Sequence, residues 1–164
     1  MPLQKAIETP YSPIDCDPHA SRVVRYMRTS DIGVWAAGTA GAPFLLGLWN
    51  MADPVPTSRV AYRVAGVLGF VGGFLLAYQR SSLRFWGWSE NQREQEMDMK
   101  ELRQLAKEGK PLYGTSDQPE WVQSAAHRNS VYSALKFSAI PMFNFVNHPH
   151  HGTDASKYAP EKSD

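Results

Sequence analysis

The sequence is poor in cysteine and carries almost no excess charge. It has one cysteine, Cys16, among 164 residues, which excludes an internal disulfide framework and a four-cysteine zinc site. Its 17 Lys and Arg residues nearly balance 16 Asp and Glu residues, for a formal net charge of +1. A general nucleic-acid-binding domain carries a clear basic excess, so this class is disfavoured. The length suits one ordinary domain.

Motifs that carry catalysis are missing as well. Four neighbouring glycines lie inside an apolar stretch and not in a strand-to-helix turn, which excludes a phosphate-binding loop. The Ser, His and Asp residues have no recognisable catalytic setting. The long apolar stretches have no mid-span Glu, Lys or His, which a proton-translocating helix needs. We therefore expect no catalytic residue, no cofactor of its own and no ion conduction.

A cluster of histidines near the C-terminus invites a metal interpretation, because imidazole binds zinc, copper and nickel. These are His148, His150 and His151. No cysteine lies near them, their spacing is generic, and flanking Pro and Gly residues indicate a loop. We favour a hydrogen-bonded or solvated surface cluster, with a metal site as the minor alternative. Cys16 and His19 form a CxxH pair that is too incomplete for a zinc or haem site.

Two apolar stretches dominate the first half of the chain. Residues 32–52 are 21 residues without a formal charge, with Trp35 and Trp49 near the two ends, where amphipathic rings favour a membrane interface. Residues 60–79 form a second, shorter stretch. The connector, residues 53–59, is short, polar and broken by prolines. This pattern predicts a transmembrane helical hairpin; a buried helix of a soluble protein is the alternative.

Small residues recur every four positions along the second stretch. They are Ala61, Ala65, Gly69, Gly73 and Ala77. The first stretch has a shorter row, Gly33, Ala37 and Gly41. Helices in lipid associate through close backbone packing, which small residues permit. We expect Ala65, Gly69, Gly73 and Ala77 to pack helix against helix; the simple abundance of Gly and Ala in membrane helices is the alternative.

Arginines predict the orientation of the hairpin. The flanks carry Arg22, Arg25, Arg28, Arg80, Arg84 and Arg93, whereas the connector side carries Arg59 and Arg63. The six flanking arginines outnumber the two at the connector, which predicts that both termini lie on the positive side of the membrane. This side is the cytosol of a bacterium or the matrix of a mitochondrion. Arg22, Arg25 and Arg28 are spaced to share one helical face beside the membrane, where they either bind acidic lipid headgroups or serve as ordinary flanking charge.

The N-terminal segment lacks the features of a targeting peptide. The first apolar run begins only at residue 32, and residues 1–20 carry Lys5 against three acidic residues, unlike an Arg-rich matrix-targeting peptide. We expect any organelle import to use internal signals.

After the hairpin the composition becomes polar. Ser89 and Gln92 have the spacing of a capping box and predict a helix over residues 90–108. This helix has one thin apolar stripe, formed by Met99, Leu102, Leu105 and Ala106. We expect the stripe to contact a partner; a fully solvated helix is the alternative. A second helix is expected over residues 119–138, followed by an apolar docking stretch at 140–146 and a polar tail at 147–164.

These elements together predict an all-α membrane protein: a two-helix transmembrane hairpin with extramembrane helices and extended tails. We divide the chain into an N-terminal extramembrane segment (1–31), the hairpin (32–79), an amphipathic and charged helical segment with the docking stretch (80–146), and the C-terminal tail (147–164).

Four stretches of the sequence resemble one family. They are TPYSPIDCDPHASRVVRYMRTSD (residues 9–31), FLLAYQRSSLRFWGWSENQREQEMDMKELR (74–103), GKPLYG (109–114) and IPMFNFVNHPHHGTDASKY (140–158). Together they are similar to the fungal two-span accessory subunit of mitochondrial respiratory complex I, NADH:ubiquinone oxidoreductase, in its membrane arm.

The resemblance implies a supernumerary, non-catalytic subunit of the mitochondrial inner membrane. Such a subunit has no flavin, iron–sulfur cluster, quinone site or proton channel, and it supports assembly by packing on core subunits and on phospholipid, with cardiolipin as one candidate. The alternative is a free-standing hairpin protein that binds acidic lipid. A lipid-shaping protein needs a helix with a broad apolar face, and residues 90–108 offer only a narrow one.

Overall fold

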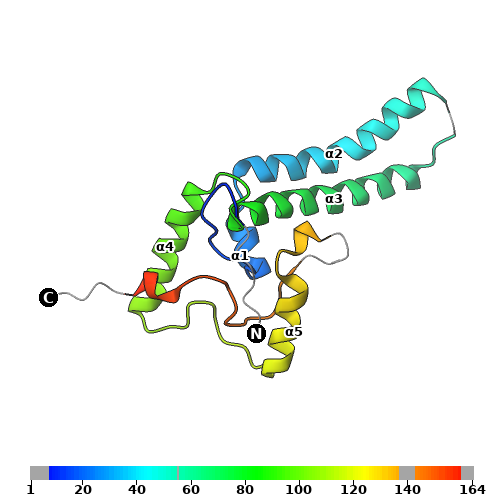
Figure 1. Ribbon diagram of the computed structural model, residues 1–164. Helices are drawn as coiled ribbons and strands as arrows, with labels where there is room; N and C mark the ends of the chain where they lie inside the picture. The colour runs from blue at the N-terminus through cyan, green and yellow to red at the C-terminus, as the bar shows by residue number, and fades with distance from the viewer. Residues whose placement is uncertain (1–7, 55, 137–142, 160–164) are drawn as a thin grey trace. The chain divides into compact units, whose positions relative to one another are not determined.

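The computed structural model describes residues 8–54, 56–136 and 143–159, and these residues are helical or irregular, without a strand. The helices are α1 (Ala20–Arg25), α2 (Thr29–Ala52), α3 (Arg59–Phe85), α4 (Gln92–Lys107) and α5 (Glu120–Ser130), with the short 3₁₀ helices η1 (Ser133–Leu135) and η2 (Ala155–Tyr158) (Figure 1). The chain divides into two compact units, residues 24–81 and residues 1–23 with 82–164.

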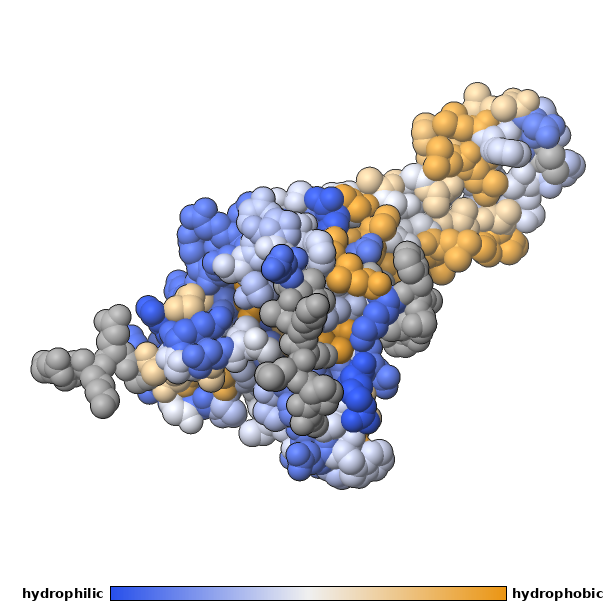
Figure 2. Space-filling model, in the orientation of Figure 1, coloured by the Kyte–Doolittle hydropathy of each residue, from blue (hydrophilic) through white to orange (hydrophobic). Residues whose placement is uncertain are grey.

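The unit of residues 24–81 contains the predicted hairpin. α2 has 24 residues and α3 has 27, both long and apolar enough to cross a membrane. None of the most hydrophobic 18-residue stretch of α2 is buried within the chain. Figure 2 shows apolar residues, in orange, along this hairpin. The exposed apolar side chains near its tip include Phe44, Leu45, Trp49 and Met51. The two-span fold class is thereby confirmed.

α3 extends further than the second apolar stretch, because the residues after Gln79 continue the helix to Phe85. The chain then turns at Gly87, whose φ of +75° lies in the left-handed region. A side chain at Gly87 would collide with the carbonyl oxygen of Tyr11, which lies in the same unit. The backbone N–H of Tyr11 donates to the Gly87 carbonyl at 3.0 Å, so this turn holds the N-terminal segment.

The capping box predicted at Ser89 and Gln92 does not form, since α4 begins only at Gln92 and its N-cap is Asn91. The side chain of Asn91 is buried and donates instead to the carbonyl oxygens of Ser12 (2.9 Å) and Arg84 (2.8 Å). Tertiary hydrogen bonds therefore override the local capping pattern at this position.

α4 buries a mixed face against its own chain. Glu94, Asp98 and Leu102, spaced four apart, are buried, so Leu102 is the one buried member of the predicted apolar stripe, whose other members are half-buried. The helix ends at Lys107, one residue before the predicted end, and the N–H of Lys110 reaches back to the Leu105 carbonyl across Gly109, whose φ is +65°.

α5 is shorter than the predicted helix over 119–138. It ends at Ser130, and Tyr132 follows with a φ of 51° in the left-handed region. The N–H of Tyr132 then donates to the Cys16 carbonyl at 3.4 Å, which draws the chain out of the helix. Residues 140–142 of the apolar docking stretch lie outside the described residues; within its described part, 143–146, Asn144 is buried and Phe145 is exposed.

Candidate functional site

The most concentrated polar chemistry lies around the segment of residues 14–17, in the unit of residues 1–23 and 82–164. Backbone bonds hold this segment in place: Ile14 N–H donates to the Phe85 carbonyl at 2.8 Å, and Cys16 N–H donates to the His151 carbonyl at 3.0 Å. The N–H of Asp17 donates to Asp15 Oδ1 at 2.9 Å, which forms an Asx turn. Both aspartates are consequently buried and point into the unit.

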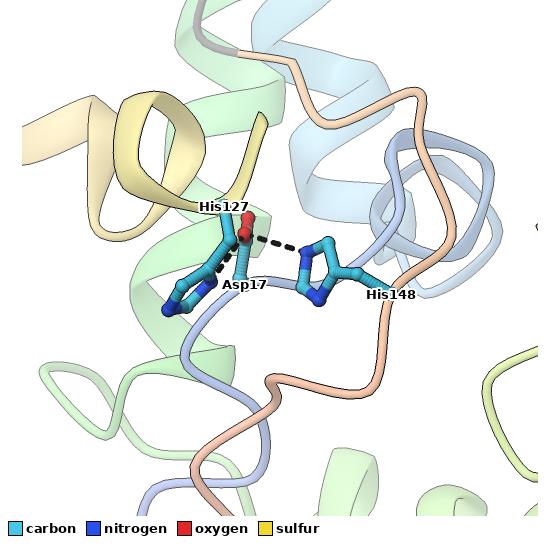
Figure 3. A group of neighbouring side chains, drawn as sticks. All are labelled: Asp17, His127 and His148. Carbon is cyan, nitrogen blue, oxygen red and sulfur yellow. Dashed lines mark hydrogen bonds and ion pairs between the residues drawn. The ribbon is translucent and has the colours of Figure 1, made fainter. Parts of the chain in front are cut away.

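One carboxylate oxygen collects three hydrogen bonds. Asp17 Oδ2 lies 3.0 Å from His127 Nδ1 on α5 and 2.8 Å from His148 Nε2 in the C-terminal segment (Figure 3). It also lies 2.7 Å from Ser130 Oγ. Burial alone raises the pKa of Asp17, but these three hydrogen bonds outweigh burial and lower it below its ordinary value of 3.8. Asp17 is therefore an anion that joins three distant parts of the sequence.

Asp17, His127 and His148 also have the residue types and spacing of a metal site, with one potential ligand atom each within 4.8 Å of the others. The hydrogen bonding favours another assignment. His148 Nδ1 accepts the N–H of His150 at 3.1 Å, so a neutral His148 carries its proton on Nε2, facing Asp17. A metal ion on Nε2 would require that proton to leave or move. The geometry therefore fits a hydrogen-bonded cluster.

A second carboxylate organises the other half of the cluster. The Asp15 oxygens lie 2.8 and 2.9 Å from His151 Nδ1, while His151 Nε2 lies 2.7 Å from the His148 carbonyl. The Tyr113 ring stacks on the His151 ring with centroids 3.7 Å apart. His148 and His151 are both buried, so the expectation of a surface histidine cluster is wrong for these two, although hydrogen bonding accounts for both rings.

Arg22 completes this network and is buried within the chain. Its guanidinium pairs with Asp15 at 3.3 Å and makes a shorter contact with Asp98 of α4. Tyr158 Oη donates to the other oxygen of Asp98 at 2.5 Å, and burial, then this carboxylate, raises the pKa of Tyr158. Buried charges need such partners, because an isolated buried ion is costly.

The prediction that Arg22, Arg25 and Arg28 share one helical face is wrong. Arg22 is buried in the network with Asp15 and Asp98. α1 ends at Arg25, and Arg28 is the extended N-cap of α2, with φ −83° and ψ 160°. The spacing suggested one helix, whereas the chain breaks between two.

Cys16 is not a reactive thiol. It is buried, and burial, together with the neighbouring Asp15 and Asp17 carboxylates, raises its pKa to about 12. The thiolate, which is the nucleophile and the metal ligand, is therefore scarcely populated at neutral pH. His19 of the CxxH pair instead contacts Ser21, with Nδ1 2.8 Å from Oγ.

The predicted helix-packing residues lie in the hairpin unit. A Cβ added at Gly73 would lie 2.7 Å from the Trp35 carbonyl oxygen, and one at Gly69 would lie 2.9 Å from Ala42 Cβ and still nearer the Gly38 carbonyl. Ala77 is buried and Ala65 is half-buried. The helix that meets Gly69 and Gly73 is α2 of the same chain. Gly33 and Gly41 of the shorter row face open space, so the close contact uses a different side of α2.

Sequence reasoning missed the partnership between the Asp15–Asp17 segment and the histidines. The two acidic residues and three histidines come from positions more than 100 residues apart, and no spacing rule joins them. The one signal for this partnership in the sequence is the pair Asp15 and Asp17, which lies beside a segment of mostly apolar and small residues. A chain that buries Asp15 and Asp17 must supply donors to them.

Comparison with known proteins agrees with the resemblance noted above. A family model described as NADH-ubiquinone oxidoreductase complex I, 21 kDa subunit, matches residues 8–90, and one described as the C-terminal of NADH-ubiquinone oxidoreductase 21 kDa subunit matches residues 99–163. The NADH-ubiquinone oxidoreductase 20.9 kDa subunit of Neurospora crassa is 48% identical over 160 residues, which cover 95% of this chain and 85% of that protein. The chain therefore belongs to the family of the 21 kDa subunit of NADH-ubiquinone oxidoreductase, complex I.

Proposed function

We propose that the chain is a non-catalytic accessory subunit of mitochondrial complex I that supports assembly and stability of the membrane arm. The observation that carries this proposal is the hairpin, whose apolar surface the chain itself leaves uncovered. Such a surface is satisfied only by lipid or by other membrane subunits. Because the chain belongs to a family of complex I subunits, we take the membrane subunits that cover the hairpin to be those of complex I.

A structural role also agrees with the state of the buried polar groups. Asp15, Asp17, Arg22, His148 and His151 are bound to one another or to the backbone, and none is left with the pairing of nucleophile and base that catalysis requires. Their arrangement ties the N-terminal segment, α4, α5 and the C-terminal segment into one extramembrane body. We propose that this body docks on core subunits of the membrane arm.

The proposal is tested by removing the chain from its host. We expect the amount of assembled complex I to fall, because an uncovered interface destabilises the assembly. The turnover of NADH:ubiquinone reduction, divided by the amount of intact complex, should stay unchanged. Re-expression of the full chain is the control. A normal amount of complex with a specifically lowered turnover would show that the chain takes part in the reaction.

We propose the mitochondrial inner membrane as the location, with both termini in the matrix. Arg22 and Arg84 are buried in ion pairs and carry little weight, but Arg25, Arg28, Arg80 and Arg93 still outnumber Arg59 and Arg63 at the connector.

Protease added to mitoplasts is therefore expected to leave α4 uncut around Lys100 and Lys107. A matrix enzyme in the same sample is the control for leakage. Cleavage within α4, while that matrix enzyme stays intact, would reverse the orientation.

Phospholipid is a proposed second partner, with cardiolipin as one candidate. Arg28 is the N-cap of α2 and Arg25 lies three residues before it, and Arg25 is exposed. The competing function, a free-standing hairpin that binds acidic lipid, predicts a small particle on native electrophoresis of mild-detergent extracts. Membership of the complex I subunit family favours the accessory role.

A further inference from the structure

The hairpin unit contains an apolar groove that the accessory role does not explain. Its volume is about 440 Å³, within the range of small-molecule sites. It is lined by Ile32, Trp35, Ala36, Thr39 and Ala40 of α2 and by Phe70 of α3. The one hydroxyl among them is already used, since Thr39 Oγ1 donates to the Trp35 carbonyl at 2.8 Å. The lining therefore suits a hydrocarbon.

The wall of the groove is fixed by a bond between the two helices. The indole Nε1–H of Trp35 donates to the Phe70 carbonyl oxygen at 3.0 Å, and its ring centroid lies 5.1 Å from those of Phe70 and Phe74. The helices also touch at backbone level, where a Cβ on Gly38 would lie 2.9 Å from Gly73 Cα. The groove is therefore preformed and cannot close by rotation of Trp35 alone.

A cation, Arg80, is held next to the Ile32 end of the groove. Asp31, which precedes Ile32, is buried and accepts from Arg80 Nε at 3.0 Å. The Arg80 side chain is 51% exposed, and within the described part of the chain no residue accepts from its Nη groups. A guanidinium in this state matches two oxygens of a phosphate.

The dimensions of the groove select among occupants. From Ile32 to Ala40 the helix rises about 12 Å, at ~1.5 Å per residue. A neighbouring helix is about 10–12 Å across with its side chains and is too broad to enter between two helices whose backbones touch. A single hydrocarbon chain is narrow enough, and the apolar lining offers it contact along the whole rise.

We propose that this groove holds one acyl chain of a membrane phospholipid whose phosphate binds the Arg80 guanidinium. The proposal rests on the membrane-spanning hairpin of the proposed function and adds a defined lipid site to it. Arg80 keeps its Nε on Asp31 and offers its Nη groups to the phosphate. Trp35 and Phe70 form the walls, and Ala36 and Ala40 leave the space that the chain fills.

The test uses a phosphatidylcholine analogue with a photoreactive diazirine in one acyl chain, added to inner membranes that contain the full-length tagged chain. Labelled peptides should cover residues 32–40 and Phe70. Ala36→Leu with Ala40→Leu fills the groove while keeping the helix apolar, and we expect labelling there to fall several-fold. Gly33→Leu with Ala37→Leu is the matched control, because both positions are exposed and lie outside the groove lining.

Arg80→Lys tests the phosphate contact separately. It keeps a cation beside Asp31 but removes the two-pronged guanidinium, so labelling should decrease without being abolished. Unchanged labelling in this variant would overturn the phosphate contact. Equal labelling in the variant with leucine at positions 36 and 40 and in its control would overturn the acyl site. A photoreactive residue introduced at position 36 is a second test, and its crosslinking to a protein subunit instead of lipid would also overturn the site.

Native electrophoresis of the same samples separates this proposal from the accessory role. Loss of labelling in a variant that still co-migrates with complex I supports the lipid site independently of assembly. If the unmodified chain fails to co-migrate, the same labelling is measured in vesicles of phosphatidylcholine and the analogue. Labelling confined to the groove then still supports the lipid site, and uniform labelling of the hairpin still overturns it.

Discussion

Replacing Gly69 and Gly73 together with leucine is expected to open the hairpin and to release the chain from complex I during mild-detergent extraction. A Cβ at Gly73 would lie 2.7 Å from the Trp35 carbonyl oxygen, and a Cβ at Gly69 would be nearer still to the Gly38 carbonyl. These obstacles are backbone atoms, so no rotamer change relieves them and the helices must separate. Overpacking typically costs about 1–3 kcal/mol per site, and here two sites act on one interface.

The matched control for this pair is Gly66→Leu with Gly72→Leu. Both glycines lie on α3, and a Cβ at either meets nothing within 4 Å, so the control adds equal bulk in the same helix without a collision. Both double variants should remain in the membrane pellet after alkaline carbonate, because the span stays apolar. Native electrophoresis then decides. If both pairs co-migrate with complex I as the unmodified chain does, the contact of α2 with α3 does not hold the chain in the complex.

Replacing Asp17 with alanine is expected to destabilise strongly the unit of residues 1–23 and 82–164. The change leaves His127 Nδ1 and the buried His148 Nε2 without their shared acceptor, whereas Ser130 Oγ can still donate to the Ala126 carbonyl. Removing one partner of a buried pair costs about 3–5 kcal/mol. Asp17→Asn keeps one acceptor oxygen of similar shape and should cost less. Asp117→Ala, at an exposed aspartate, should cost almost nothing.

Limited proteolysis of the full chain in detergent measures this effect. The segment joining α4 to α5, residues 108–119, should be cut fastest in Asp17→Ala, more slowly in Asp17→Asn, and at the unmodified rate in Asp117→Ala. Equal rates in all three variants would show that the Asp17 cluster does not hold the unit together.

The same carboxylate gives the unit a defined acid sensitivity. Because the folded protein lowers the pKa of Asp17, the stabilisation is complete above its ordinary value of 3.8 and is lost as the pH falls through the lower, folded value. This contribution should be absent from Asp17→Ala at every pH, so the difference in protease resistance between the two proteins should shrink below about pH 4.

The hairpin could be predicted from the sequence because its physics is local and repetitive. An uninterrupted apolar stretch at residues 32–52 has few alternatives to a spanning helix, and the Pro-rich connector forces the return. The four-residue recurrence includes Gly69 and Gly73, where an added Cβ would meet the backbone of α2. The sequence could not show that α2 supplies the opposing surface through Gly38 and Trp35, because the shorter glycine row at Gly33 points elsewhere.

The unit of residues 1–23 and 82–164 could not be predicted in this way, because long-range hydrogen bonds override its local signals. Asn91 takes the N-cap position of α4 while its side chain bonds the Ser12 and Arg84 carbonyls. Arg22 has the spacing of a lipid-facing arginine, but the buried Asp98 of α4 captures it. In both cases the decisive partner lies far along the chain and leaves no periodic trace.

The most direct measurement of the proposed accessory role is native electrophoresis of a mild-detergent extract from mitochondria that express the full chain with a tag. The tagged chain should migrate with complex I activity and remain there when excess unlabelled membrane extract is added. A chain found only in a small particle, with complex I migrating separately and undiminished, would contradict the assignment as an accessory subunit.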